Sequence, residues 1–230
     1  PVITGNEGSG NDDVQVSFRS LVEDGDVAAI IGATTDGATM RSVSLANFFN
    51  VPMVVPSAGG DNLLPSNNLW AFRLSAPSSS YASYIFGSLI LKPAPLPAAE
   101  GEPVDLAGKL AIVYEQTTFG ESAAVAAAHA AMDLSMEITI YQPFPAESKE
   151  PLKLEQIAGD IFESGAHLVY MVCSEPEIAQ MLASAVKDQY QNGMMPVLLG
   201  MEGGFATSAF INSQGANGVY LVRQAIDRAE

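Results

Sequence analysis

Short apolar runs alternate with segments of helical periodicity along most of this chain. Between residues 27 and 60, the apolar run Val27–Ile31 leads into small polar residues, and a helical pattern over Gly37–Phe49 follows. A second apolar run at Pro52–Val55 then ends in the small residues 57–60. In a parallel sheet both small-residue segments lie at the carboxyl ends of strands, the edge where open α/β sheets bind ligands. Small residues let a ligand approach the backbone, and the first turn of a helix offers free N–H groups. The pattern therefore predicts a small-molecule site at this edge.

The same alternation continues on both sides of a stretch rich in proline and alanine, Lys92–Pro103. Before that stretch we expect a helix at Asp13–Val22, a strand at Trp70–Leu74 and a helix that starts within Pro77–Ser80 and uses Tyr84, Ile85 and Leu89 as its core face. After it we expect strands at Lys109–Tyr114, Met136–Tyr141, His167–Val172, Val197–Gly200 and Gly218–Val222. The helices between them are expected at Glu121–Leu134, Leu154–Ser164, closed by Gly165, and Pro176–Gln189.

Continuous apolar strands separated by helices are typical of parallel sheets that are covered on both faces. Prolines remove backbone donors and fix φ, so Lys92–Pro103 is expected to be a linker or a long surface loop. We therefore predict an α/β fold with two Rossmann-like lobes. Residues 1–91 form the first lobe, 92–103 the linker and 104–230 the second lobe.

The charge balance narrows the range of partners. The 230 residues contain 10 basic and 26 acidic side chains, a net charge of −16, spread along the chain without clusters. Such a chain repels nucleic acid and anionic membrane surfaces, so neither is an expected partner. We favour a role of the acidity in solubility over attraction of a cationic ligand. No apolar run is long enough to span a bilayer, and no signal peptide is evident, so Pro1 fits a mature or trimmed chain.

The residues that could support catalysis or metal binding do not form a known pattern. The single cysteine, Cys173, ends an apolar strand pattern, so we interpret it as a core residue and expect no internal disulfide. His129 and His167 lack neighbours at metal-ligand spacing and are interpreted as structural. Neither a phosphate-binding loop nor a GxSxG nucleophile motif is present. We predict a protein without catalytic residues, metal or cofactor.

The ordered set of segments resembles one known family. The segments are VAAIIGATTDGATMRSV, VPMVVPSAGGDNL, WAFRLSAPSSSYASYI, KLAIVYEQTTFGES, VYMVCSEPEIAQM and PVLLGMEGG. They resemble the type I periplasmic solute-binding proteins, the branched-chain amino acid and amide binders of ABC transporters. The resemblance runs from about Asp13 to about Val222. It implies two lobes that close on a ligand and perform no chemistry.

The resemblance also implies roles for particular residues. Asp36 falls where relatives place a serine on the ligand carboxylate, and a carboxylate here would repel that group. Ser57 and Gly59 fall where relatives use a backbone carbonyl and a hydroxyl, although Gly59 has no hydroxyl. Phe119 matches an aromatic residue that covers the ligand, and Glu202 matches the acid that binds its ammonium group. The predicted ligand-binding residues are Thr35, Asp36, Gly37, Ser57, Ala58, Gly59, Phe119, Ser174 and Glu202.

Simpler interpretations of these residues remain open. Asp36 could cap the helix that starts at Gly37, and the cap and ligand roles are compatible. Glu202 could be an exposed loop carboxylate. Phe119 could be a core residue, although its neighbours place it on a loop. Ser174 or Glu175 stands where relatives often carry another aromatic residue.

Relatives also carry elements beyond both ends of the matched region. They begin with a strand and a helix before the segment that corresponds to Val2–Thr4, and they cross back after the segment near Val222 to finish the first lobe. We therefore expect the first lobe to be incomplete at both ends. The chain is then a fragment, or the missing parts are supplied elsewhere or lost.

The functional hypothesis from sequence is non-catalytic binding of a small polar solute, an amino acid or an amide-like molecule, in the cleft between the lobes. The solute would be delivered to the membrane permease of an ABC importer. The protein would be periplasmic or extracellular, with a lipid anchor as an option in the full-length protein. Two alternatives are a ligand-sensing domain of a receptor or regulator, and an α/β hydrolase-like enzyme.

Overall fold

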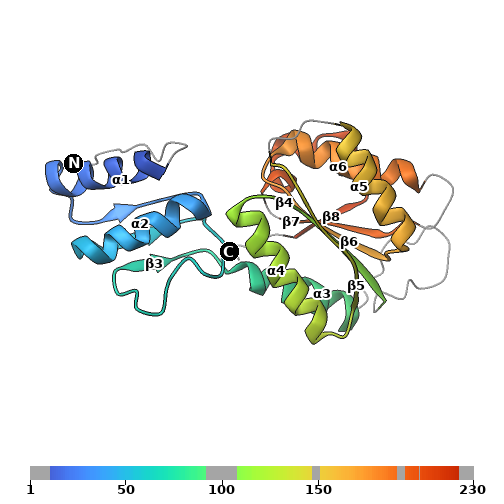
Figure 1. The fold of residues 1–230 in the computed structure, drawn as a ribbon, viewed down its shortest axis with the longest axis horizontal. Helices are drawn as coiled ribbons and strands as arrows, with labels where there is room; N and C mark the ends of the chain where they lie inside the picture. Colours follow the sequence, from blue (N-terminus) through green and yellow to red (C-terminus); the bar gives the residue numbers. More distant parts are fainter. Residues whose placement is uncertain (1–10, 92–107, 147–150, 191–194, 202, 223–230) are drawn as a thin grey trace, which may run out of the picture. The chain divides into compact units, whose positions relative to one another are not determined.

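The computed structural model describes residues 11–91, 108–146, 151–190, 195–201 and 203–222. The predicted linker at 92–103 lies outside these residues. The chain divides into two compact units, unit 1 at Pro1–Ser78 and unit 2 at Ser79–Glu230 (Figure 1). The lobe boundaries predicted from sequence stay a prediction.

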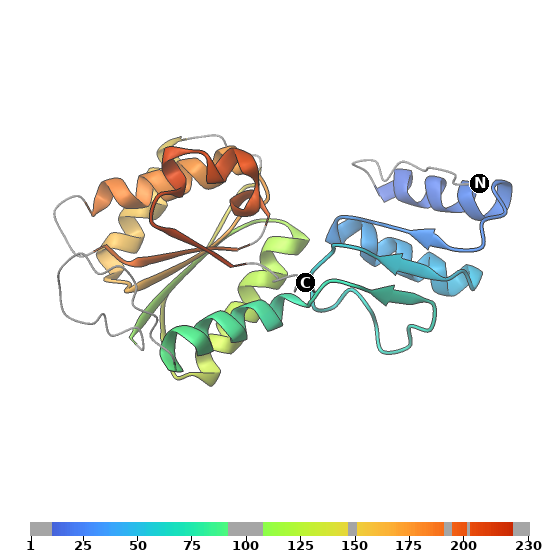
Figure 2. The same cartoon turned by 180° about the vertical axis from the view of Figure 1, so that it is seen from behind.

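Unit 1 is a short parallel sheet with helices that pack on one another. Its elements are α1 (Asn11–Arg19), a π-helical turn η1 (Ser20–Asp24), β1 (Ile30–Ile31), α2 (Asp36–Phe49), β2 (Met53–Val55) and β3 (Ala71–Arg73). The strands are parallel in the order β1-β2-β3, and α1 packs against α2 (Figure 2). The core contains Phe18, Val43, Ala46, Met53, Val55, Ala58, Leu63 and Ala71.

The first strand is shorter than the sequence predicts. Only Ile30 and Ile31 of the expected strand Val27–Ile31 pair with β2, and both Ala28 and Ala29 are exposed. A strand of a parallel sheet continues only as far as the neighbouring strand offers hydrogen-bond partners. Its neighbour β2 has only three residues, so β1 is short. The apolar run therefore predicted a longer strand than the structure contains.

One face of the unit 1 sheet carries exposed apolar side chains. Ile31 lies opposite Val54, and Val54 lies opposite Phe72, so the three form one row across the sheet. Ile31 is 81% exposed and Phe72 58% exposed. The other face carries the buried residues Met53, Val55 and Ala71, as strand alternation requires. This unit therefore has one buried and one open sheet face.

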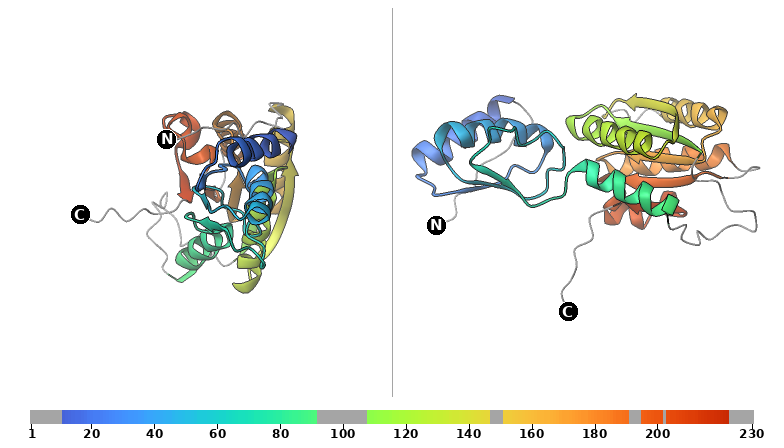
Figure 3. Two further views of the ribbon diagram at one scale, coloured as in Figure 1. Left: turned by 90° about the vertical axis from the view of Figure 1, so that its left-hand side faces the viewer. Right: turned by 90° about the horizontal axis from the view of Figure 1, so that it is seen from below.

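Unit 2 is a five-stranded parallel sheet covered on both faces. Its strands, in the order β5-β4-β6-β7-β8, are β5 (Glu137–Phe144), β4 (Lys109–Glu115), β6 (Leu168–Val172), β7 (Val197–Met201) and β8 (Val219–Val222). Its helices are α3 (Ser78–Leu91), α4 (Thr118–Asp133), α5 (Pro151–Ser164), α6 (Pro176–Gln189) and α7 (Ser208–Ile211), with short turns η2 (Gly204–Ala206) and η3 (Gln214–Ala216). Helices α3 and α4 cover one face, and α5 and α6 cover the other (Figures 1 and 3).

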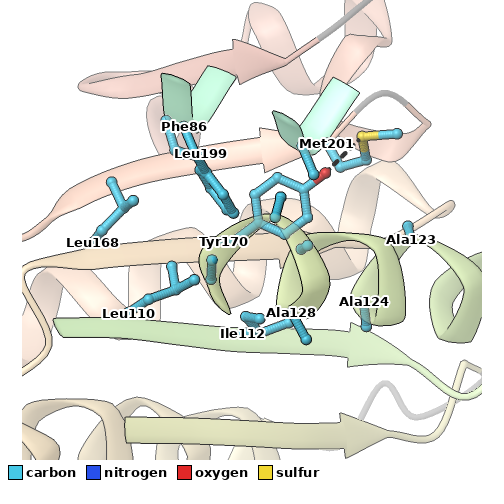
Figure 4. Close-up of a cluster of buried hydrophobic side chains, with 14 of the residues drawn as sticks. Phe86, Leu110, Ile112, Ala123, Ala124, Ala128, Leu168, Tyr170, Leu199 and Met201 are labelled. Atoms are coloured by element: carbon cyan, nitrogen blue, oxygen red, sulfur yellow. Dashed lines mark hydrogen bonds between the residues drawn. The ribbon is translucent and has the colours of Figure 1, made fainter. Parts of the chain in front are cut away.

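The face under α3 and α4 is built around Tyr170. This side chain is fully buried, and its ring contacts Phe86 of α3 edge to face at 5.5 Å between centroids (Figure 4). Its hydroxyl donates to Met201 Sδ at 3.0 Å. Small alanines of α4, including Ala123, Ala124 and Ala127, let that helix approach the sheet closely.

Several sequence expectations are corrected here. Tyr84 is 77% exposed, because the buried side of α3 is formed by Ala82 and Phe86, one turn apart. Helix α4 starts at Thr118, three residues before the predicted Glu121, because Thr117 caps it. The elements η2, α7 and η3 were not expected. Strand β5 ends at Phe144, three residues after the predicted Tyr141, and α5 begins at Pro151, three residues before the predicted Leu154. The other strands and α6 lie within one residue of their predicted bounds, and Gly165 has the left-handed φ of +64° expected after α5.

None of the helices in the described part of the chain is long and apolar enough to cross a membrane.

Candidate functional site

The first group of predicted residues lies where β1 leads into α2. Thr35 has extended backbone angles, and its side chain accepts a hydrogen bond from the Ala38 N–H at 3.3 Å, so Thr35 is the N-cap of α2. Of the two roles that the sequence left open for Asp36, the helix cap is therefore wrong. Asp36 is instead the first helical residue, and Gly37 follows it in the first turn. Thr34 and Thr35 are exposed.

Asp36 turns its side chain into unit 1 and is only 4% exposed. Its Oδ1 accepts a hydrogen bond from the Gly59 N–H at 2.9 Å, which joins the segment after β1 to the segment after β2. Its Oδ2 is buried without a hydrogen bond and lies against Gly60, where an added Cβ would be 2.7 Å away. Burial raises the pKa of Asp36, and the backbone N–H groups of Gly60 and Gly59 and the charge of Arg73 oppose the rise.

The segment after β2 is held by side chains of unit 1. The Gly59 carbonyl accepts from both the N–H and the hydroxyl of Ser78, at 2.8 and 3.0 Å. The Ala58 carbonyl accepts from Ser75 Oγ at 2.7 Å. Ser57 is exposed, and its hydroxyl donates to the Thr34 carbonyl at 3.1 Å. The six predicted residues of unit 1 therefore lie on two adjacent strand ends, with Thr35 and Ser57 accessible and Ala58 buried.

The strand ends of unit 2 are joined by Glu115, which the sequence analysis did not select. Glu115 ends β4 and is 1% exposed. Its Oε2 accepts from the Ser174 N–H at 2.7 Å, and its Oε1 accepts from the hydroxyls of Thr117, at 2.8 Å, and of Ser174. These contacts connect the end of β4 with the segment that follows β6. They give the buried carboxylate hydrogen-bond donors, and burying a carboxylate without such donors costs free energy.

Phe119 lies in the first turn of α4, not on a loop as expected. The helix begins earlier than predicted because Thr117 Oγ1 accepts from the Gly120 N–H at 3.0 Å. Phe119 is partly buried and packs against the core under α3 and α4. Its Cε1 would lie 3.6 Å from a Cβ placed on Gly203, so the ring borders the segment after β7.

Ser174 is exposed and lies beside the same glycine. A Cβ on Gly203 would be 3.6 Å from Ser174 Cα and 2.9 Å from the Cys173 carbonyl oxygen, and Gly203 has a φ of +119°. Both the close approach and the backbone angle require glycine here. Phe119, Ser174 and Gly203 thus come together from three strand ends of unit 2. Glu202 lies outside the described residues.

Cys173 is a core residue, as the sequence suggested. Cys173 is fully buried, and burial with the nearby Glu115 charge raises its pKa to about 12, so its thiol is a core group. Among the described residues, no group of three His, Cys, Asp or Glu side chains could hold a metal ion.

One feature of the sequence points to the role of Glu115. The run KLAIVYE places a carboxylate directly at the end of an apolar strand, before the small residues of TTFG. A charge at that position must be exposed or paired. Its partner, Ser174, is 59 residues away. The pairing therefore could not be read from local sequence.

Comparisons with known proteins identify the fold. No family model matches the chain, and no curated protein matches it. Solved structures do match. An extracellular ligand-binding receptor from Rhodopseudomonas palustris HaA2 has a TM-score of 0.74 at 15% identity, covering 93% of this chain and 55% of the receptor.

Two further solved structures have named ligands in their descriptions. A solute-binding protein of an ABC transporter from Rhodopseudomonas palustris BisB5, in complex with 3,4-dihydroxybenzoic acid, gives a TM-score of 0.69 at 14% identity, covering 89% of this chain and 52% of that one. A leucine-binding protein from Thermotoga maritima MSB8 gives 0.66 at 12% identity, covering 85% and 50%.

These likenesses show that the chain has the fold of type I periplasmic solute-binding proteins, as the sequence resemblance predicts. The chain spans about half the length of the solved structures that it matches.

Proposed function

We propose that this chain binds a small polar solute at the carboxyl ends of its parallel strands and serves an ABC importer without performing chemistry. The observation that carries the proposal is the arrangement of exposed hydroxyls on braced strand ends. Ser57 and Ser174 are both accessible, and each sits on a segment fixed by a buried carboxylate, Asp36 or Glu115. Rigid backbone with accessible polar groups at the carboxyl edge of parallel strands is suited to ligand binding.

The proposed solute is an amino acid or a related amide. Glu202 is assigned to its ammonium group and Phe119 to its apolar part, by analogy with the family. The solved structures with this fold include proteins described with 3,4-dihydroxybenzoic acid and with leucine, so aromatic acids belong in any ligand screen. The permease of the importer is the proposed partner, and the periplasm or the cell exterior is the proposed location.

The experiment is native mass spectrometry of the purified protein, followed by thermal-shift screening with amino acids, amides and hydroxybenzoates. We expect a co-purified small molecule or a raised melting temperature with one class. The double variant Ser57→Ala/Ser174→Ala should lose that response, whereas Ser83→Ala, on the exposed side of α3, should keep it. Absence of any response, or turnover of ester and amide substrates that is lost on removing one strand-end serine, would contradict the proposal.

A second candidate is a ligand-sensing role with the same binding surfaces. One of the similar solved structures is described as an extracellular ligand-binding receptor, and this description supports the second candidate. Both roles predict ligand binding. Co-purification with a permease distinguishes the importer role from sensing.

A further inference from the structure

Ser174 is an exposed residue two positions after β6, and the only proton of its hydroxyl is already donated. That proton is donated to Glu115 Oε1, while the N–H of the same residue is donated to Glu115 Oε2 at 2.7 Å. A serine hydroxyl has one donor proton and two acceptor lone pairs. The solvent-facing side of Ser174 Oγ is therefore left with acceptor capacity alone.

Glu115 keeps the hydroxyl in this orientation. The carboxylate is 1% exposed and depends on three donors, the two from Ser174 and the hydroxyl of Thr117. If Ser174 turned its proton toward a ligand, a buried carboxylate oxygen would lose a charge-assisted hydrogen bond. Thr117 cannot compensate, because its single proton already goes to Glu115 while its oxygen accepts from Gly120 N–H.

We propose that Glu115 is a specificity-determining positioning residue: it holds Ser174 Oγ as an acceptor, so this surface takes a hydrogen-bond donor of the solute. Suitable donors are an ammonium group, an amide N–H or a hydroxyl. A solute carboxylate is disfavoured because it would meet an acceptor, with the Glu115 charge behind it. The inference rests on the proposed function only in assuming that the solute contacts this surface.

The binding test uses pairs of probes that differ in donor groups. L-leucinamide is paired with 4-methylpentanoate, and 4-hydroxybenzoate with benzoate. By calorimetry, the wild-type protein should favour the donor-bearing member of a pair, and Ser174→Ala should reduce that affinity about tenfold. Glu115→Gln should narrow or invert the preference, because the glutamine amide can donate to Ser174 Oγ and turn its proton outward.

Two controls separate this effect from a loss of structure. Glu155→Gln removes an exposed charge of α5, and Ser83→Ala removes an exposed hydroxyl of α3, so both should keep the wild-type preference. Far-UV circular dichroism establishes that each variant is folded. Equal weakening for both members of a pair in Glu115→Gln, with the preference unchanged, would overturn the specificity role.

A neutron structure of the unliganded protein tests the hydroxyl orientation without any ligand. We expect the Ser174 deuteron between Ser174 Oγ and Glu115 Oε1, and a deuteron turned toward solvent would overturn the inference. If no probe binds the wild-type protein, the proposed function fails for these solutes. The neutron result still decides the orientation of Ser174, so the two failures are distinguishable.

Discussion

At the scale of single residues, each unit uses one buried carboxylate to fasten adjacent strand ends. Asp36 accepts from Gly59 in unit 1, and Glu115 accepts from Ser174 and Thr117 in unit 2. In both units a threonine caps the helix that follows the first of these strands. The carboxylates differ in how many hydrogen bonds they accept: Asp36 Oδ2 accepts none, whereas Glu115 Oε1 accepts two and Oε2 accepts one.

This difference predicts a pH dependence for unit 1. The raised pKa of Asp36 means that the folded state holds its proton more tightly than the unfolded state does. The stabilisation from Asp36 is therefore complete below its ordinary pKa of 3.8 and is lost as the pH rises through the raised value. Urea unfolding followed by the fluorescence of the single tryptophan, Trp70 of unit 1, should show this fall.

The matched variants for this measurement are Asp36→Asn and Asp24→Asn. Asp36→Asn should remove the pH-dependent component, whereas Asp24→Asn, an exposed residue of η1, should keep it. The readout is the slope of the unfolding free energy with pH, because the asparagine amide also changes local hydrogen bonding. Identical slopes for the wild-type protein and Asp36→Asn would contradict the prediction.

A second prediction at the residue scale concerns the contribution of Glu202 to ligand binding. If it binds the ammonium group of the solute, Glu202→Ala should weaken binding of an amine-bearing ligand by about 2–4 kcal/mol, the scale for losing a charge-assisted partner. Isothermal titration calorimetry measures this loss, with Glu163→Gln on the exposed face of α5 as the control. Unchanged affinity would remove Glu202 from the site.

At the scale of elements, the start of α4 is fixed by close contact with the end of β4. A Cβ at Gly120 would lie 2.0 Å from the Glu115 carbonyl oxygen and 2.8 Å from its Cγ. Gly159 of α5, in contrast, has no atom within 4 Å of the same position. The two helical glycines therefore serve different purposes.

Alanine substitutions at the two glycines should change the free energy of unfolding in opposite directions. Gly120→Ala should destabilise unit 2 by about 1–3 kcal/mol, because the added methyl group is forced against backbone. Gly159→Ala should stabilise it by about 0.5–1 kcal/mol, because alanine restricts the unfolded chain and favours the helix. Chemical unfolding followed by far-UV circular dichroism measures both. A neutral Gly120→Ala would mean that the helix start shifts freely.

The cap of α4 gives a further test of the same junction. Thr117→Val removes the hydroxyl that accepts from Gly120 N–H and donates to Glu115, so unit 2 should lose about 1–2 kcal/mol. Thr118→Ala, at the next and exposed position, should change the unfolding free energy by less than about 0.5 kcal/mol. Equal effects of the two substitutions would count against a capping role for Thr117.

At the scale of the whole molecule, the two units differ in how completely they cover their sheets. Both faces of the unit 2 sheet are buried under helices, and its central strands β6 and β7 are buried at every position. Unit 1 has a three-stranded sheet and leaves Ile31, Phe72 and Leu74 largely exposed. Exposed apolar rows and short edge strands favour association and faster opening.

We therefore expect amide hydrogen exchange to be faster in β1 and β2 than in β4 and β6. At high concentration the chain should self-associate through the Ile31–Val54–Phe72 row, and Phe72→Ser should weaken that association in sedimentation experiments. Leu152→Ser, at an even more exposed position of α5, should have little effect. A monomer with uniformly slow exchange in β1 and β2 would contradict this account.

Much of the architecture was determined by the sequence itself. Alternating apolar runs and helical segments fix element type through local backbone preference and through burial of one face, so α2, α6 and the strands of unit 2 could be placed from the sequence. The same local signals placed Thr35 and Ser57 at strand ends, whereas Ser174 was selected through the family resemblance. The fold was predictable because each segment independently favours its own structure.

Tertiary structure alone decided which side chains meet and which remain accessible. Asp36 faces the interior because Gly59 offers it a donor from 23 residues away, and Glu115 becomes a brace because Ser174 reaches it from the next strand of the sheet. Phe119 joined a helix because Thr117 capped it early, and Tyr84 was exposed because α3 buries Phe86 instead. Such outcomes depend on packing between distant segments, and the free energy of a buried carboxylate is set by partners that local sequence does not contain.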